Sequence, residues 1–216
     1  MVYVVDHRAR DDFALELEEM FQQRRTMFVE RLRWPLRVDE RGRERDEFDT
    51  QDAVYLLDRD RESGRLLGSL RLLRTDRPHL LSVHFPHLCE GVLPCGEDVL
   101  EVSRFVTAPG LPRDRTLRVR HRLASALMEH GLEEELSDYT LVTHMSWLPT
   151  LLSVGWSCAP LGLAQPLGAE SIGAMRIEVS EAGLAALRSF GGRYPVITPH
   201  PSSEVLVAIR SAAYAV

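Results

Sequence analysis

Charged residues interrupt stretches of this sequence that are otherwise apolar. Arg71 lies in the run SLRLL, and Glu101 and Arg104 lie in LEVSRF. A buried ion costs on the order of several kcal/mol unless it is paired, so these residues require partners. The acidic stretch RDEFD offers Asp46 and Asp49. Two interpretations are open: a cluster of salt bridges that holds a loop to a sheet, or a site that binds a charged substrate.

The composition limits the kinds of protein that the chain can be. Its 216 residues fit one domain with a real core, and its formal net charge is −6. All of the basic residues are Arg, whose planar guanidinium suits carboxylate and phosphate, although a GC-rich genome produces the same bias. The cysteines lack a CxxC spacing, which argues against a zinc site and a disulfide framework.

Several other functions are disfavoured by the same inspection. An acidic chain without a basic face studded with aromatics is a poor nucleic-acid binder. The histidines show no HExxH spacing, and no P-loop or dinucleotide fingerprint is present, so we expect neither a metal nor a cofactor. The first residues lack a signal-peptide pattern, and no apolar run reaches membrane-spanning length. We therefore expect a cytoplasmic protein without membrane insertion.

Helical and strand patterns alternate along the chain and predict a three-layer αβα sandwich. A helix capped by Asp11 and Asp12 is expected up to about residue 33, and a polar loop follows over 36–52. Strands are expected over 53–60, 65–75, 99–107, 139–145 and 174–179. Further helices are expected over 79–88, 114–136 and 180–190, with a short one ending near 154. We expect a single domain over residues 1–216, with residues 1–52 forming a helix and a mobile loop.

A set of residues along the first half of the chain resembles the acyl-homoserine-lactone synthases, the autoinducer synthases of bacterial quorum sensing. The resemblance is dense in the first half and loose in the second. Leu100 stands where the family often has Trp, and Arg74 where Pro is common. The matching residues are Arg24, Phe28, Trp34, Asp46 and Asp49 in DEFD, Tyr55 and Leu56, Arg71, Phe85 and Pro86, and Glu101 to Phe105 in ExSRF.

The resemblance implies a fold similar to the N-acetyltransferases, with a mixed and largely antiparallel sheet. It also implies a reaction between two substrates. An acyl group passes from a thioester, on acyl carrier protein or coenzyme A, to the amine of S-adenosylmethionine. The methionyl carboxylate then attacks its own γ-carbon, which expels methylthioadenosine and leaves the N-acyl homoserine lactone. S-adenosylmethionine is a substrate here, so no cofactor is implied.

The residue types suit S-adenosylmethionine, which carries a sulfonium, an ammonium, a carboxylate and a flat adenine. Asp46 and Asp49 are expected to face the ammonium and sulfonium, and Arg104 or Arg24 to bind the carboxylate. Phe28 and Trp34 are expected to cover the sulfonium or adenine by cation–π or stacking contact. The alternative for these two aromatics is a hydrophobic contact at a helix end. The loop of residues 36–52 would close over the ligand and exclude water.

Glu101 is the candidate general base, since the amine must be neutral before it attacks a thioester. A carboxylate surrounded by arginines is a poorer base, so Glu101 is alternatively an orienting group for Arg71 or for the substrate. Residues three apart on a regular strand point to opposite faces, which separates Glu101 from Arg104. We therefore expect a β-bulge over residues 101–104.

The acyl chain is expected to lie beneath the second half of the sheet. In the family, a Thr near position 143 often accompanies 3-oxo substrates, but the same hydroxyl can bond within the sheet. Thr143 and Met145 are expected on one face of a strand, with Leu141 beside them. The full set of candidate acyl-binding residues is Phe85, Ser103, Phe105, Leu141, Thr143 and Met145.

The segment PRDRTLRVRHRL concentrates positive charge in an acidic chain. Arg115, Arg118 and Arg122 share one helix face. This face suits docking of an acidic acyl carrier protein, which family frequency favours over coenzyme A as the donor. The alternative is a solvated helix surface that is paired to acids elsewhere. The stretch TAPGLPRDRTLR lacks the glycine-rich turn of ordinary acetyl-CoA enzymes. A general N-acyltransferase and a non-catalytic ligand-binding relative remain the alternatives to a synthase.

Overall fold

The computed structural model describes residues 1–191 and 197–198, and it divides into two compact units. Unit 1 comprises Met1–Arg71, Arg104–Ala126 and Pro195–Val216, and unit 2 comprises Leu72–Ser103 and Leu127–Tyr194. Strands β3 (Leu66–Arg74) and β4 (Val99–Thr107) and helix α3 (Arg113–Glu133) each contribute residues to both units. The expectation of a single domain over residues 1–216 stays a prediction.

Unit 1 begins with strand β1 (Val2–Val5), which pairs antiparallel with β2 (Val54–Arg59) and parallel with β9 (Ile197–Thr198). Helix α1 (Ala14–Arg24) continues directly into a π-helix, η1 (Arg25–Arg31). A long irregular segment then leads to β2, with one isolated bridge between Val38 and Glu44. The polar composition of this segment gives no strand or helix period, which is why it forms a loop.

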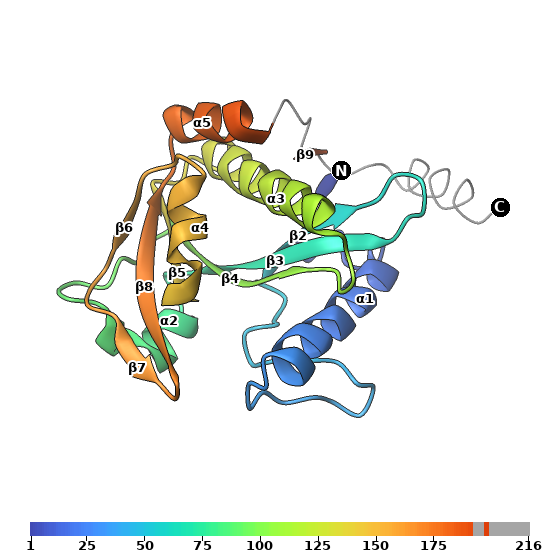
Figure 1. The fold of residues 1–216 in the computed structure, drawn as a ribbon, viewed down its shortest axis with the longest axis horizontal. Coiled ribbons are helices and arrows are strands. Elements are labelled where there is room, and N and C mark those ends of the chain that lie inside the picture. Colours follow the sequence, from blue (N-terminus) through green and yellow to red (C-terminus); the bar gives the residue numbers. More distant parts are fainter. Residues whose placement is uncertain (192–196, 199–216) are drawn as a thin grey trace. The chain divides into compact units, whose positions relative to one another are not determined.

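Helices cover both faces of the strands in unit 1, as Figure 1 shows for α1 and α3 on either side of β2 and β3. The α3 face is packed tightly, because a Cβ added to Gly68 of β3 would come within 2.7 Å of Val119 Cγ1. On the other face, Phe21 of α1 meets Tyr55 of β2 edge to face, at 6.2 Å between ring centroids. This second face is the one that carries the charged side chains described below.

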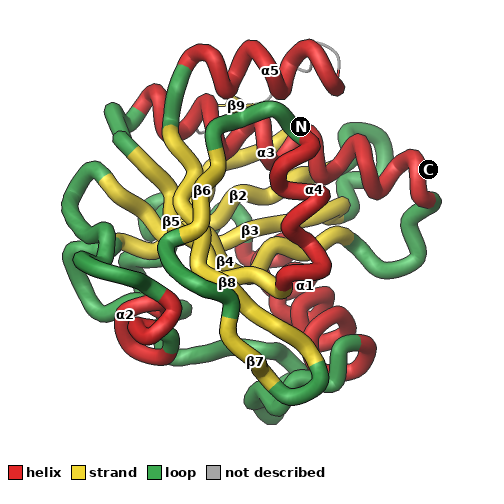
Figure 2. Tube along the Cα trace, turned by 60° about the vertical axis from the view of Figure 1, so that its left-hand side comes forward, coloured by secondary structure: helices red, strands yellow, loops and turns green. Residues whose placement is uncertain are grey.

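Unit 2 is built on strand β8 (Glu170–Glu178), which pairs antiparallel with β5 (Asp138–His144), β6 (Cys158–Pro160) and β7 (Gln165–Leu167). Figure 2 shows β5, β8 and β6 as yellow tubes in one part of the sheet. The first half of β4 pairs with β5 in parallel, from Val99 opposite Asp138 to Val102 opposite Leu141. The pairing is therefore mixed and largely antiparallel, as expected.

Helices also pack on the strands of unit 2. Leu81 of α2 (Leu80–His84) and Leu88 of η2 (Pro86–Leu88) form a buried cluster with Ile172 and Ala174 of β8. Helix α5 (Glu181–Gly191) packs against α3, where a Cβ on Gly183 would lie 3.0 Å from Met128 Cε. The connection after β5 consists of η3 (Met145–Trp147) and α4 (Leu148–Ser153).

Some boundaries differ from the sequence prediction. The first helix starts at Ala14 with Phe13 as its N-cap and without a side-chain cap, so the prediction of Asp11 and Asp12 as capping residues was wrong. The helical period also hid the switch to a π-helix at Arg25. The helix predicted over residues 79–88 is two short helices, and the strand predicted over 174–179 starts earlier, at Glu170.

Candidate functional site

Three guanidiniums and three carboxylates of unit 1 form a closed, alternating ring of ion pairs. Each acid bridges two arginines, and each arginine binds two acids. We call these six side chains the charge ring; in order they are Arg24, Glu44, Arg104, Asp46, Arg71 and Asp49, which pairs again with Arg24. Because the signs alternate and are equal in number, the ring is electrically neutral.

The distances around the charge ring are those of charge-assisted hydrogen bonds. Arg24 Nε donates to Glu44 Oε2 at 2.6 Å, and Arg104 Nη2 donates to Glu44 Oε1 at 3.0 Å. Arg104 Nη2 also donates to Asp46 Oδ2 at 2.8 Å. Arg71 Nη2 donates to Asp46 Oδ2 at 3.0 Å, and Arg71 Nη1 lies 2.9 Å from Asp49 Oδ1. The structure therefore brings Asp46, Asp49, Arg71 and Arg104 together, as the sequence analysis expected.

The charge ring is assembled by elements that are far apart in the sequence. Arg24 is the last residue of α1, Arg71 is in β3 and Arg104 is in β4. The three acids all come from the loop between η1 and β2. Burial would lower the pKa of Arg24, but hydrogen bonds and charge from Asp49 and Glu44 hold this pKa above its ordinary value.

Asp49 is the most enclosed acid of the charge ring. Its side chain is fully buried, and it accepts hydrogen bonds from Arg24 Nη1 and Nη2, from the Tyr55 hydroxyl at 2.9 Å and from the backbone N–H of Asp46. Burial would raise the pKa of Asp49, but Arg24 and Arg71 outweigh it and hold this pKa well below the ordinary value of 3.8. Asp49 is therefore a charged anchor for two arginines.

Asp46 and Arg104 are the members of the charge ring that solvent reaches most readily. The side chain of Asp46 is 14% exposed and that of Arg104 is 8% exposed, whereas Arg24 and Arg71 are fully enclosed. Asp46 and Arg104 are therefore the accessible edge of the charge ring. They are also the acid and the guanidinium that the sequence analysis assigned to the ammonium and the carboxylate.

The backbone at Arg104 departs from that of a regular strand. Its φ of 53° lies in the left-handed region, which costs a residue other than glycine about 1–2 kcal/mol. The ladder from β4 to β5 runs only from Val99 to Val102. A left-handed residue at this place is compatible with the β-bulge expected over residues 101–104, which stays a prediction. The charge ring holds Arg104 in this conformation through Glu44 and Asp46.

Two aromatic side chains lie beside Arg104. Phe28, in the π-helix, stacks on Trp34 with a centroid distance of 5.1 Å and an interplanar angle of 14°. The Arg104 guanidinium carbon lies 5.6 Å from the Phe28 centroid, within cation–π range. Trp34 follows Arg33, whose φ of 59° turns the chain after the helix. Both expectations for this pair fit the arrangement, since the rings pack at a helix end and also line the charged site.

In unit 2, the candidate base Glu101 is fully buried. Its Oε1 accepts a hydrogen bond of 2.9 Å from the backbone N–H of Leu81, in the first turn of α2. Phe85 packs against the buried cluster that Leu81 belongs to. Glu101 is thus linked to the helix that Phe85, a candidate acyl-binding residue, directly follows.

The other candidate acyl-binding residues are spread over several elements. Leu141 is buried in β5, and the Thr143 hydroxyl donates to the carbonyl of His144 at 3.4 Å. Met145 lies in η3, because β5 ends at His144, so the prediction of Met145 on the same strand face as Thr143 was wrong. Ser103 and Phe105 lie in β4, Ser103 in unit 2 and Phe105 in unit 1.

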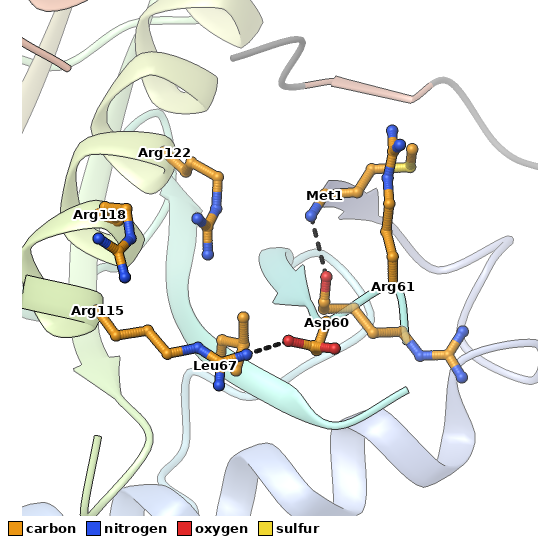
Figure 3. Close-up of a pocket in the computed structure, with 8 residues that line it drawn as sticks. Met1, Asp60, Arg61, Leu67, Arg115, Arg118 and Arg122 are labelled. Carbon is orange, nitrogen blue, oxygen red and sulfur yellow. Dashed lines mark hydrogen bonds and ion pairs between the residues drawn. The ribbon is translucent and has the colours of Figure 1, made fainter. Parts of the chain in front are cut away.

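The arginines of α3 are paired with acids of unit 1. Arg122 Nε donates to the buried Asp58 at 2.8 Å, Arg118 Nη2 donates to Asp114 at 2.6 Å, and Arg115 donates to Asp60. Figure 3 shows these arginines around a shallow pocket of about 170 Å³. Its lining residues are Met1, Arg59, Asp60, Arg61, Leu67, Arg115, Arg118 and Arg122. The pairing to acids that was the alternative to a docking surface is therefore present. Arg115 and Arg118 nevertheless keep nearly half of their side-chain surface exposed.

Sequence reasoning missed Glu44, and it named Tyr55 as part of the resemblance without giving it a role in the site. Glu44 closes the ring between Arg24 and Arg104, and Tyr55 donates its hydroxyl to Asp49. Three buried arginines require three acids, which calls for one more acid beside Asp46 and Asp49, but the stretch ERDEFD offers both Glu44 and Glu47. In the part of the chain that the structure describes, no helix is long and apolar enough to cross a membrane.

Comparisons with known proteins agree with this geometry. The family model described as autoinducer synthase matches residues 8–187. Among curated proteins, the isovaleryl-homoserine lactone synthase of Bradyrhizobium diazoefficiens is 33% identical over 165 residues, which cover 76% of this chain and 73% of the relative.

Solved structures extend the likeness to the fold. A CoA-dependent acyl-homoserine lactone synthase, solved with S-adenosylmethionine and isopentyl-CoA, matches with a TM-score of 0.84 and 27% identity, over 98% of this chain and 99% of the relative. An acyl-CoA N-acyltransferase from Pseudomonas aeruginosa matches in fold alone, with a TM-score of 0.53 and 18% identity over 82% and 98% of the two chains. The expected likeness to N-acetyltransferases is thereby confirmed. The chain belongs to the autoinducer synthase family, and it is an acyltransferase of the acyl-homoserine-lactone synthase type.

Proposed function

We propose that the charge ring of this synthase binds the amino-acid end of S-adenosylmethionine and that an acyl thioester is the second substrate. The observation that carries this proposal is the position of Arg104. Its guanidinium is partly exposed, lies beside Asp46 and rests near the face of Phe28. A single place thus offers a cation, an anion and an aromatic face, which are the three kinds of group that S-adenosylmethionine requires.

In this proposal Arg104 binds the methionyl carboxylate and Asp46 binds the ammonium. Phe28 and Trp34 cover the sulfonium or the adenine. Arg24, Arg71 and Asp49 are too deeply enclosed to meet a ligand first, so they support the two outer residues. Arg104 and Asp46 are already paired with each other, so each keeps a partner of opposite charge when the substrate binds.

The proposed reaction has two steps. The neutral amine attacks the thioester carbonyl, so that a C–N bond forms, the C–S bond breaks and the amine proton passes to a base. The methionyl carboxylate then attacks the γ-carbon, and the bond to the sulfonium sulfur breaks with release of methylthioadenosine. Glu101 is the candidate base, directly or through a water molecule. Its bond to Leu81 makes an orienting role the second candidate.

The donor is the finer part of the proposal. Acyl carrier protein is the donor that the basic face of α3 favours, since Arg118 and Arg115 remain half exposed. Acyl-CoA is the second candidate, because the solved relative is described as CoA-dependent and holds isopentyl-CoA. We place the enzyme in the cytoplasm, where both kinds of thioester are made.

The test is an assay of the purified protein with S-adenosylmethionine and a panel of acyl thioesters. Mass spectrometry should detect an acyl-homoserine lactone together with one equivalent of methylthioadenosine. Acyl transfer to other amines without methylthioadenosine would favour a general N-acyltransferase. Binding of S-adenosylmethionine without any product would favour a non-catalytic relative. To identify the donor, kcat/KM is measured for acyl-CoA and for the acyl carrier protein that carries the same acyl chain. The thioester with the higher kcat/KM is the preferred donor.

A further inference from the structure

We propose that Glu44 is a positioning residue, whose carboxylate fixes the Arg104 guanidinium in the orientation that binds the substrate carboxylate. This inference rests on the proposed function of the charge ring. Glu44 touches neither substrate in the proposed scheme, because only 1% of its side chain is exposed. It acts through Arg104.

The contacts of Glu44 link the innermost arginine to the outermost one. Its Oε2 accepts from Arg24 Nε at 2.6 Å, and its two oxygens accept from Arg104 Nε at 3.2 and 3.3 Å. Arg104 Nη2 adds a bond of 3.0 Å. The carboxylate thus grips the whole Nε–Nη2 edge of Arg104, in the fork geometry that fixes the plane of a guanidinium. Asp49 in turn binds Arg24 through two hydrogen bonds, so Glu44 connects Arg104 to a side chain that is itself held in place.

The contacts with Glu44 determine which nitrogen of the Arg104 guanidinium a ligand can bind. Within the charge ring, the bonds of Arg104 all leave from Nε and Nη2, and its Nη1 donates to neither Glu44 nor Asp46. Nη1 is therefore the donor that is left for the substrate carboxylate. The left-handed backbone at Arg104 gives no support of its own, because such a conformation persists only when surrounding contacts hold it.

Loss of Glu44 would act in two ways that can be separated. The orientation of Arg104 would be lost, and the neutral charge ring would gain a net positive charge. The first effect weakens any ligand that carries the methionyl carboxylate. The second weakens chiefly a ligand with a net positive charge, such as S-adenosylmethionine.

Three adenosyl ligands distinguish these effects. S-adenosylmethionine has the carboxylate and the sulfonium, S-adenosylhomocysteine has the carboxylate but is a neutral thioether, and methylthioadenosine has neither. We expect Glu44→Gln to raise the Kd of the first two by about tenfold or more, as the loss of a charged hydrogen bond does. The Kd of methylthioadenosine should change by less than about twofold. Isothermal titration calorimetry of wild type and variant measures all three values.

Glu40→Gln is the matched control, because Glu40 is an exposed acid of the same loop and the substitution is chemically identical. It should leave all three Kd values unchanged. Equal weakening of all three ligands by Glu44→Gln would mean that Glu44 only maintains the fold of the loop. Weakening of S-adenosylmethionine alone would mean that only the net charge matters. Either result, or no weakening at all, overturns the proposal.

A second variant keeps the test decisive if Glu44→Gln does not fold. Glu44→Asp retains the charge but is one methylene shorter, so it does not reach both arginines. This variant should raise the Kd values of S-adenosylmethionine and S-adenosylhomocysteine more than that of methylthioadenosine, but by smaller factors than Glu44→Gln does. Failure of this inference is distinct from failure of the proposed function: a wild-type protein that makes no acyl-homoserine lactone refutes the function, whereas an active wild type with an unselective Glu44→Gln variant refutes only the role of Glu44.

Discussion

The backbone N–H of Leu81 donates a hydrogen bond to the carboxylate of Glu101, and both groups are buried. A residue that was expected to move a proton therefore also holds the first turn of α2. Leu81 belongs to the apolar cluster that Phe85 packs against, so the carboxylate is tied to a candidate wall of the acyl site. The two roles of Glu101 make different demands on its side chain and can be separated by substitution.

Glu101→Gln retains an oxygen that accepts the Leu81 N–H, whereas Glu101→Ala leaves that buried donor without an acceptor. We expect the alanine variant to lose about 1–3 kcal/mol of unfolding free energy through this group, and the glutamine variant to lose less. If Glu101 is the general base, the glutamine variant should nevertheless lose about 10²-fold or more in kcat. Chemical unfolding and product formation measure the two effects. A stable glutamine variant with nearly full kcat would assign Glu101 to orientation instead.

The lowered pKa of Asp49 predicts how stability depends on pH. A carboxyl whose folded-state pKa lies below its unfolded value of 3.8 stabilises the fold above that value, and this contribution disappears as the pH falls towards the folded-state pKa. The stability difference between wild type and Asp49→Asn should therefore be large and constant above about pH 5, near 3–5 kcal/mol for a broken buried pair. It should shrink below about pH 4.

Urea unfolding between pH 2 and pH 7 tests the Asp49 prediction, with Glu40→Gln as an exposed control from the same loop. The control should follow the wild-type curve. A difference between wild type and Asp49→Asn that stays constant down to pH 2 would contradict the assignment, because it would show that Asp49 has the same pKa in the folded and unfolded states.

Thr143 is the residue through which the preference for the acyl chain is predicted to act. Its hydroxyl donates a long hydrogen bond of 3.4 Å to the carbonyl of His144, a weak contact that a 3-oxo group could replace. Thr143→Ala should lower kcat/KM for a 3-oxoacyl donor relative to the unsubstituted donor of equal length, by about fivefold. Thr143→Ser keeps the hydroxyl and should keep the preference. An unchanged ratio in the alanine variant means that the hydroxyl serves only the strand.

The basic face of α3 is predicted to control association with a carrier protein. Reversal of Arg122 would set a carboxylate against the buried Asp58, so Arg118→Glu alone is the cleaner test. We expect it to raise the KM for acyl carrier protein by roughly threefold or more at low salt, with a smaller effect at high salt, and to spare the KM for S-adenosylmethionine. Arg188→Glu, at a position with the same 49% exposure, is the control. Equal KM values for both variants would refute docking on this face.

The sequence predicted the charged members of the site better than it predicted how they are held. Arg71 and Arg104 stand out because they interrupt apolar strands, and Asp46 and Asp49 because they crowd one short stretch. Glu44 was overlooked because an irregular loop has no period, and nothing in the residue types says which of its acids turn inward. Tyr55 is among the residues that carry the resemblance, but nothing in the strand pattern shows that its hydroxyl donates to Asp49.

The spacing of apolar residues also gave a wrong prediction where the α-helix changes to a π-helix. The apolar spacing up to Phe28 suits a continuous α-helix, but the chain widens into a π-helix at Arg25, and Leu32 is 46% exposed instead of buried. Phe28 of this π-helix stacks on Trp34, a contact that the helical propensities of the residues do not predict. Strand β1 was likewise not predicted, since its partner β2 is distant in the sequence. Strands β6 and β7 were not predicted because three residues are too few to show a strand period.

The alternation of the charge ring has a consequence for the history of the family as well as for its chemistry. Because each member serves two neighbours, a single substitution harms two contacts at once, and a second substitution elsewhere in the ring repairs only one of them. The six positions are therefore expected to drift together or not at all, with strong epistasis between them. A relative that has lost the enzymatic activity should have lost all six charged residues, and relatives that keep only some of them should be rare.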